Sequence, residues 1–150
     1  MYKGEGLGPG EDQFKSACLE EKLDVLLSRE PIDRFSFDLG PSARFHQQIL
    51  PSSPPLTPSD IFRQTESALK FIRPYYQGPL AAENYNYYPT GLDDHICEPG
   101  FIRAYLDEFG LGLTLDLAHA AVTAHNLDLE LHQYLEELPL DKTVEIHISR

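Results

Sequence analysis

Long hydrophobic runs are missing from this chain of 150 residues, and their absence excludes several classes of protein. The apolar stretches are only a few residues long, far short of the roughly 20 residues with which a helix spans a membrane. Residues 1–13 are polar and glycine-rich, without the apolar segment of a secretory signal peptide. We therefore expect no membrane span and no secretion signal. We also expect residues 1–13 to be disordered ahead of one domain over residues 14–150.

Basic residues and cysteines are also scarce. Twelve Lys and Arg stand against 24 Asp and Glu, which gives a net charge of -12. A surface this acidic repels a phosphate backbone, so nucleic acid is not an expected partner. The two cysteines, Cys18 and Cys97, form neither a CxxC motif nor a disulfide framework. This usage is typical of a reducing compartment, and we expect the protein to be cytoplasmic.

Several catalytic motifs are absent as well. The sequence contains no P-loop and no GxSxG, and the glycines near its start follow no predicted strand, so they do not form a dinucleotide-binding loop. Cys97 has no histidine placed in the sequence to activate it, and we interpret it as a packed thiol.

What the sequence does contain is a regular alternation of helix and strand patterns. Helices are predicted over residues 13–29, 59–73, 98–110 and 127–139, and strands over 32–39, 78–84, 111–120 and 142–150. The proline-rich stretch 41–58 is predicted to be a loop, with Thr57 or Ser59 capping the helix that follows. The alternation predicts an α/β fold whose right-handed, parallel βαβ units form about half of a TIM (β/α)8 barrel. A small open α/β sheet is the alternative.

Ionisable residues mark the carboxyl ends of three predicted strands, where parallel α/β folds place their sites. Glu83 ends the second strand, Asp116 and His119 end the third, and His147 ends the fourth. Asp116 and His147 alternate with large aliphatic residues, which are expected to face the outer helices. This phase places both side chains on the inner face of the sheet beside Glu83.

Carboxylates and imidazoles that converge at the carboxyl ends of the strands suit Fe(II), Mn, Zn or Co. The lack of convergent thiols disfavours an iron–sulfur cluster. A cation would also offset the repulsion between neighbouring carboxylates. A structural interpretation stays open, because an Asp-x-x-His spacing arises by chance and a single histidine is often a satisfied polar residue. As a second group we assign Asn84, Tyr85, Tyr87 and His125 to a substrate pocket, although tyrosines here could instead cover the barrel rim.

Three segments carry a resemblance to a known family. AENYNYYPTGLDDHICEPGFI, LTLDLAHAAVTAHN and LPLDKTVEIHIS, in this order and spacing, resemble the DUF692 family, and the likeness covers about residues 30–150. The resemblance implies a xylose-isomerase-like TIM barrel with two or three non-haem iron ions. It also implies an oxidase that modifies cysteine residues of a ribosomally made peptide in natural-product biosynthesis, often with a separate peptide-binding partner protein. By the same resemblance Glu83, Asp116, His119 and His147 would be iron ligands.

The chain departs from the family in two respects. A DUF692 barrel is roughly twice as long, and its additional strands supply further ligands. In the family, the strand that precedes the Glu-Asn strand usually carries a histidine. This sequence has Arg34 and Asp38 across that stretch, and only Asp38 could ligate a metal. Two other functions therefore stay open beside the iron oxidase: a divalent-metal isomerase or hydrolase on a similar barrel, and a non-catalytic fragment or degenerate homologue.

Overall fold

A computed structural model of the chain describes residues 25, 31–39, 57–89 and 94–148. In these residues the elements follow in the order β1 (Phe35–Asp38), α4 (Pro58–Ile72), β2 (Leu80–Glu83), the 3₁₀ helix η1 (Asp94–Cys97), α5 (Pro99–Phe109), β3 (Gly112–Asp116), α6 (Leu117–Asn126), α7 (Leu131–Glu137), the 3₁₀ helix η2 (Leu140–Lys142) and β4 (Thr143–His147). The predictions for residues 1–13, for the loop 41–56 and, apart from Val25, for the helix 13–29 fall outside the described residues. No helix of the described part has the length and apolarity needed to cross a membrane.

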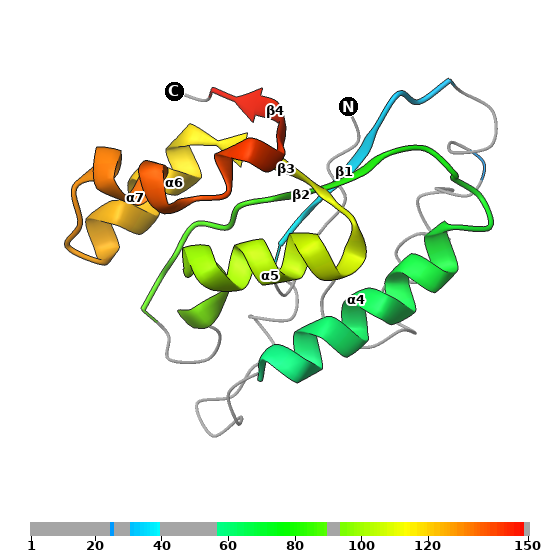
Figure 1. Cartoon of the computed structure of the whole chain (residues 1–150), viewed down its shortest axis with the longest axis horizontal. Coiled ribbons are helices and arrows are strands. Elements are labelled where there is room, and N and C mark those ends of the chain that lie inside the picture. The colour runs from blue at the N-terminus through cyan, green and yellow to red at the C-terminus, as the bar shows by residue number, and fades with distance from the viewer. Residues whose placement is uncertain (1–24, 26–30, 40–56, 90–93, 149–150) are drawn as a thin grey trace.

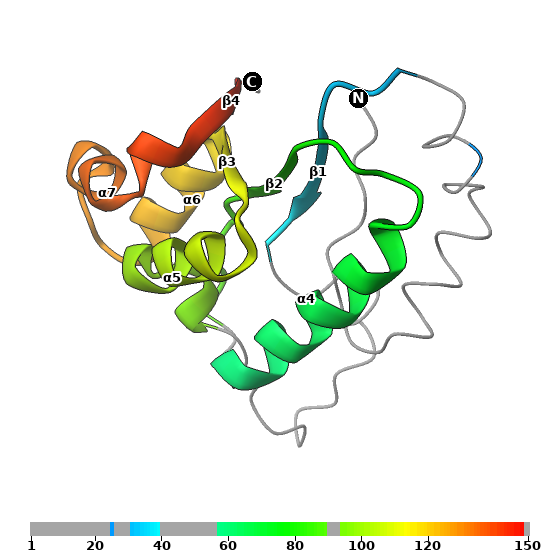
Figure 2. The same cartoon turned by 45° about the vertical axis from the view of Figure 1, so that its right-hand side comes forward.

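The four strands form one parallel sheet in the order β1-β2-β3-β4. Strands that are consecutive in sequence are neighbours in space, which is how the strands of a TIM barrel follow one another. Helices α4 and α5 lie side by side against the sheet, and α6 and α7 follow beside β3 and β4 (Figures 1 and 2). The predicted fold class, an α/β fold of parallel strands that corresponds to part of a TIM barrel, is confirmed.

Alternation along the strands separates an apolar face from a polar one. The apolar face belongs to the core beneath the helices and comprises Phe35, Phe37, Leu80, Ala82, Leu113 and Leu115, all buried. The opposite, inner face carries polar side chains that are also buried, including Ser36, Glu83, Thr114 and Asp116. Burial of both faces is typical of parallel sheets. Glu83 and Asp116 on the inner face therefore lie away from water.

Local signals define the ends of α4 and α5. Thr57 caps α4 in a capping box with Asp60, and its hydroxyl and backbone hydrogen bonds hold the pKa of the Asp60 carboxyl below its usual value. Pro99 begins α5, and Gly110 ends it in a left-handed conformation with φ 61°. The cap at Thr57, the start at Pro99 and the end at Gly110 were all predictable from sequence, because they depend on neighbouring residues only.

A buried hydrogen bond joins the two long helices. The hydroxyl groups of Thr65 on α4 and Tyr105 on α5 are 2.8 Å apart, and both side chains are about 1% exposed. The ring of Phe62 packs edge-on against Tyr105, with a centroid separation of 5.7 Å. The α4–α5 contact therefore combines aromatic packing with one satisfied polar pair.

We expect Tyr105→Phe to lower the free energy of unfolding by about 1–2 kcal/mol, because the Thr65 hydroxyl loses its buried partner. Burial raises the pKa of the Tyr105 hydroxyl, so the folded state holds this proton more tightly than the unfolded state. The associated stability is complete below the unfolded pKa near 10 and is lost as pH rises further. Urea unfolding at about pH 8 and about pH 10.5 measures both effects. Tyr88→Phe at an exposed site is the control, and an equal effect of both variants would contradict the prediction.

The predicted strand 111–120 was wrong in its second half. β3 ends at Asp116, and residues 117–126 form helix α6. The cause is Asp116, whose Oδ1 accepts hydrogen bonds from the backbone N–H groups of Ala118 and His119 and so starts the helix. The helix predicted over 127–139 is present as the shorter α7, Leu131–Glu137.

The aliphatic face of β4 is another correction. Val144, Ile146 and Ile148 are 43%, 56% and 82% exposed, and no helix in the described part of the chain covers them. Their phase opposite Glu145 and His147 is as predicted, whereas their contact with an outer helix is not. β4 is the last strand of the described sheet, so this apolar strip borders an edge. Gly112 on β3 permits the approach of β4, since a Cβ there would lie 2.6 Å from a methyl group of Val144.

Candidate metal centre

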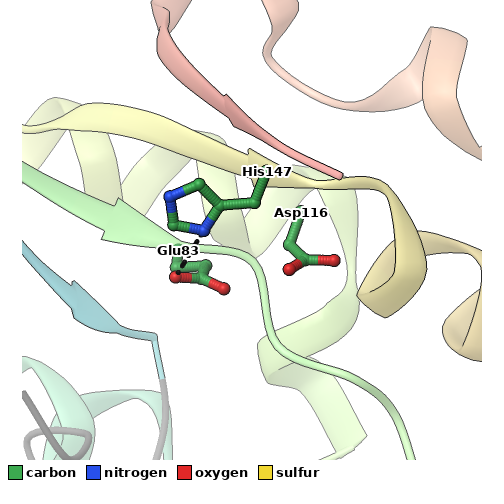
Figure 3. A group of neighbouring side chains, drawn as sticks. All are labelled: Glu83, Asp116 and His147. Carbon is green, nitrogen blue, oxygen red and sulfur yellow. Dashed lines mark ion pairs between the residues drawn. The ribbon is translucent and has the colours of Figure 1, made fainter. Parts of the chain in front are cut away.

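Three side chains from the ends of three adjacent strands converge on one point. Glu83 on β2, Asp116 on β3 and His147 on β4 each offer one ligand atom, and these atoms lie within 4.8 Å of one another. Asp116 and His147 are direct register partners. Figure 3 shows the imidazole of His147 over the Glu83 carboxylate, with the Asp116 carboxylate alongside. The common phase expected from sequence thus places these three groups together.

Glu83 is deeply buried, with 2% of its surface exposed. Its Oε2 lies 3.3 Å from His147 Nδ1, and its Oε1 lies 3.6 Å from His119 Nδ1. Transfer of a carboxylate from water to a buried position is costly unless positive charge or hydrogen bonds accompany it. Two imidazoles, or a cation held with them, meet that requirement.

Asp116 has two roles, as the N-cap of α6 and as a candidate metal ligand. Within the described residues the hydrogen bonds of its carboxylate fall on Oδ1, which caps α6 at 2.8 Å from Ala118 N and 3.0 Å from His119 N. This arrangement fixes the plane of the carboxylate and leaves Oδ2 as the atom that can reach a cation.

Asn84 holds the strand end that carries Asp116. Its Oδ1 accepts from the Asp116 backbone N–H at 2.7 Å, and its Nδ2 donates to the Asp116 carbonyl at 3.0 Å. The side chain is fully buried. Both ends of its amide are thus bonded to the backbone of the adjacent strand end, and the assignment of Asn84 to a substrate pocket stays a prediction.

We expect Asn84→Ala to lower the free energy of unfolding by about 2–4 kcal/mol, because two backbone groups of Asp116 lose buried partners. Divalent metal affinity should fall as well, since the strand end that presents Asp116 is then less well fixed. Thermal melting and zinc titration measure the two effects. Asn126→Ala is the matched control, because Asn126 also bonds a backbone carbonyl, that of Tyr87, but lies at the end of α6. Equal effects of the two variants would contradict the positioning role.

His119 lies next to the three candidate ligands but outside their group. Its Nδ1 is 2.8 Å from the Asn84 carbonyl oxygen, and its side chain is 26% exposed. This contact orients the ring and leaves Nε2 as the atom with ligand capacity. The assignment of His119 as a metal ligand stays a prediction.

The remaining predicted pocket residues lie on the segment after β2 and on α6. The backbone of Tyr85 and Tyr87 is held by Thr123 of α6, which donates to the Tyr85 carbonyl and accepts from the Tyr87 N–H. Both tyrosines are half-buried against the core, and His125 is exposed. Cys97 is buried, as expected of a packed thiol, and its Sγ lies 3.6 Å from the Tyr85 carbonyl oxygen. A substrate role for Tyr85, Tyr87 and His125 stays a prediction.

Sequence reasoning missed two polar groups on the inner face. Glu145 lies 3.1 Å from His147 Nε2 and 3.4 Å from Arg34. Its phase, two residues before His147 on the same strand, was a usable signal. Thr114 pairs in register with both Glu83 and Glu145, and its fully buried hydroxyl has no hydrogen-bond partner within the described residues. A buried hydroxyl without such a partner, next to the candidate metal ligands, favours a binding site for a polar or ionic ligand.

A parallel sheet with oxygen and nitrogen donors at its strand ends defines an α/β protein with a candidate metal centre, and comparison with known proteins identifies its family. A sequence model of the family described as RiPP precursor modification enzyme MbnB/TglH/ChrH matches residues 43–149. The chain belongs to this family, which confirms the resemblance to DUF692.

Curated relatives carry the name UPF0276 protein. The relative from Paraburkholderia phytofirmans is 39% identical over 71 residues, which are 47% of this chain and 23% of that protein. The relative from Caulobacter vibrioides is 31% identical over 71 residues, 47% of this chain and 25% of that protein. The relative from Rhizobium meliloti is 28% identical over 105 residues, 70% of this chain and 33% of that protein. The chain thus matches about a quarter to a third of the length of these relatives.

Proposed function

We propose that this chain forms part of the metal centre of a peptide-modifying enzyme, with iron as the metal and a cysteine of a ribosomally made peptide as the residue modified. The observation that carries the proposal is the convergence of Glu83, Asp116 and His147 in a member of the MbnB/TglH/ChrH family. Two carboxylates and one imidazole form a donor set suited to divalent iron. The buried hydroxyl of Thr114 on the same face adds a further polar atom.

The residues present fit such an ion in charge as well as in geometry. Glu83 and Asp116 would supply two negative charges in a buried setting, and His147 would complete a three-residue ligand set, with His119 as a fourth candidate. When bound, the ion supplies redox chemistry with dioxygen and Lewis acidity toward a thiolate. The protein's own contribution is to hold the ligands in place, through the cap at Asp116 and the amide of Asn84, and to keep water from Glu83.

The substrate side of the proposal rests on the half-buried tyrosines. Tyr85 and Tyr87 follow Glu83 directly, and we assign them, with His125, to the approach of the peptide. A separate peptide-binding protein would be the partner, as the family resemblance implies. A cytoplasmic location fits the buried thiol of Cys97.

The metal content of the purified chain tests the proposal. The chain should be prepared without oxygen, and bound iron, zinc and manganese should be counted per chain. Iron that is bound and then lost in His147→Ala supports the proposal, as does a mass change in a cysteine peptide that depends on this iron. Zinc or manganese bound in preference to iron would favour an isomerase or hydrolase. A chain that binds no divalent metal would favour a non-catalytic homologue.

A further inference from the structure

Polar contacts continue from His147 to the opposite edge of the sheet. His147 Nε2 lies 3.1 Å from Glu145 Oε1, on the same strand. Glu145 Oε2 lies 3.4 Å from Arg34 Nη1, which directly precedes β1. Because β1 and β4 are the two outer strands of the described sheet, the Arg34–Glu145 pair reaches across its inner face. Arg34, which precedes β1, is thus linked through Glu145 to the candidate ligand His147 on β4.

The imidazole of His147 lies between two carboxylates. Its Nδ1 is 3.3 Å from Glu83 Oε2, and its Nε2 is on the side of Glu145. Only 12% of the side chain is exposed, so water does not compete freely for either nitrogen. A neutral imidazole has one N–H and one lone pair, and a metal-ligating histidine usually donates its N–H to a carboxylate or carbonyl. The site offers that carboxylate on one side and the candidate ligands on the other.

We propose that Glu145, anchored by Arg34, is a positioning residue for His147. It accepts the Nε2–H and thereby directs the Nδ1 lone pair to the point between Glu83 and Asp116. This inference rests on the proposed function in one respect, namely that these three residues hold a divalent cation. Glu145 does not touch the ion.

The contacts of Glu145 argue for positioning and against direct ligation. Each of its two oxygens already has a partner, Oε1 at His147 and Oε2 at Arg34. The guanidinium offsets the charge of the carboxylate, which lowers its attraction for a cation. An arginine that holds a carboxylate, which in turn holds a histidine, orients the ring without adding a third anionic ligand.

Nitrogen NMR of the zinc-loaded chain tests the proposal directly. Zinc is diamagnetic and redox-inert, and the His147 signals can be assigned by their loss in His147→Ala. The expected result is a zinc-bound Nδ1 together with a slowly exchanging proton on Nε2. A proton on Nδ1 with zinc on Nε2 would overturn the proposal, and this readout needs no variant at Glu145.

Variants at Glu145 and Arg34 give a second, independent test. In Glu145→Gln the amide oxygen should face Arg34, so the NH2 group faces His147 Nε2 and disfavours a proton there. Zinc affinity should fall about 10- to 100-fold. Adding Arg34→Met to Glu145→Gln frees the amide to turn, and most of the affinity should return. Adding Arg34→Met to Glu145→Ala should restore little, because no acceptor is present. This contrast separates acceptor geometry from the loss of one positive charge.

The controls separate this inference from the proposed function. Glu136→Ala removes a glutamate from another histidine pair, with His132, which is exposed and lies on α7, and should leave zinc binding unchanged. If zinc binding survives both Asp116→Asn and His147→Ala, the proposed function fails. If those two variants abolish binding while Glu145→Ala and Glu145→Gln bind like the wild type, only the positioning role is overturned. If both Glu145 variants lose zinc affinity equally and Arg34→Met restores none of it, Glu145 is a direct ligand. That result would also overturn the positioning role.

Discussion

His147→Ala should lower the affinity of the chain for a divalent metal by a factor of more than about 100, with little change in the temperature of unfolding. The ring ends an outer strand and belongs to no apolar cluster of the described residues, so its removal leaves that core intact. Removal of a core side chain would instead lower stability by several kcal/mol. Metal content measured beside thermal melting distinguishes the two cases.

Asp116 requires a more conservative change, because its carboxylate also caps α6. Asp116→Ala should lose the metal and also about 1 kcal/mol of stability with the cap. Asp116→Asn keeps a capping oxygen and should lose the metal alone. His132→Ala, at an exposed histidine on α7, is the control and should retain it. Full metal retention in both Asp116→Asn and His147→Ala would rule out the ligand roles.

The isolated chain should associate in solution through β4. This strand is the last of the described sheet, and its outward face exposes Val144, Ile146 and Ile148. An exposed apolar strip beside an outer strand favours pairing with another chain, and four parallel strands correspond to half of the eight in a TIM barrel. We expect dimers or larger species in light scattering, with a second copy of this chain as the partner.

A single charge on the strip should reduce this association. Ile146→Lys places an ammonium group on the most exposed aliphatic side chain within β4 itself and should shift the chain toward monomers by about tenfold or more in dissociation constant. Leu127→Lys is the control, because Leu127 is also an exposed aliphatic residue but lies at the end of α6, away from the sheet edge. A wild-type chain that is monodisperse, monomeric and cooperatively folded would show that the sheet is self-sufficient.

Much of the fold was predictable because its signals are local. Thr57 with Asp60, Pro99 and Gly110 define helix ends through contacts within a few residues. Asp116 shows where two local signals compete. The apolar pattern of β3 continues through Leu117, but the side chain of Asp116 caps the next turn and begins α6. Both strand and helix patterns fit this segment, and the carboxylate hydrogen bonds decide between them.

The sequence by itself determined the parallel α/β fold and the inner-face position of Glu83, Asp116 and His147, because the period of two and the strand ends are properties of the chain alone. Only the tertiary structure decided that Asn84 clamps Asp116 and that Arg34 meets Glu145, 111 positions away. The physical reason is that contacts across a sheet depend on the register and arrangement of its strands. Those features arise from packing between elements, which no local pattern encodes.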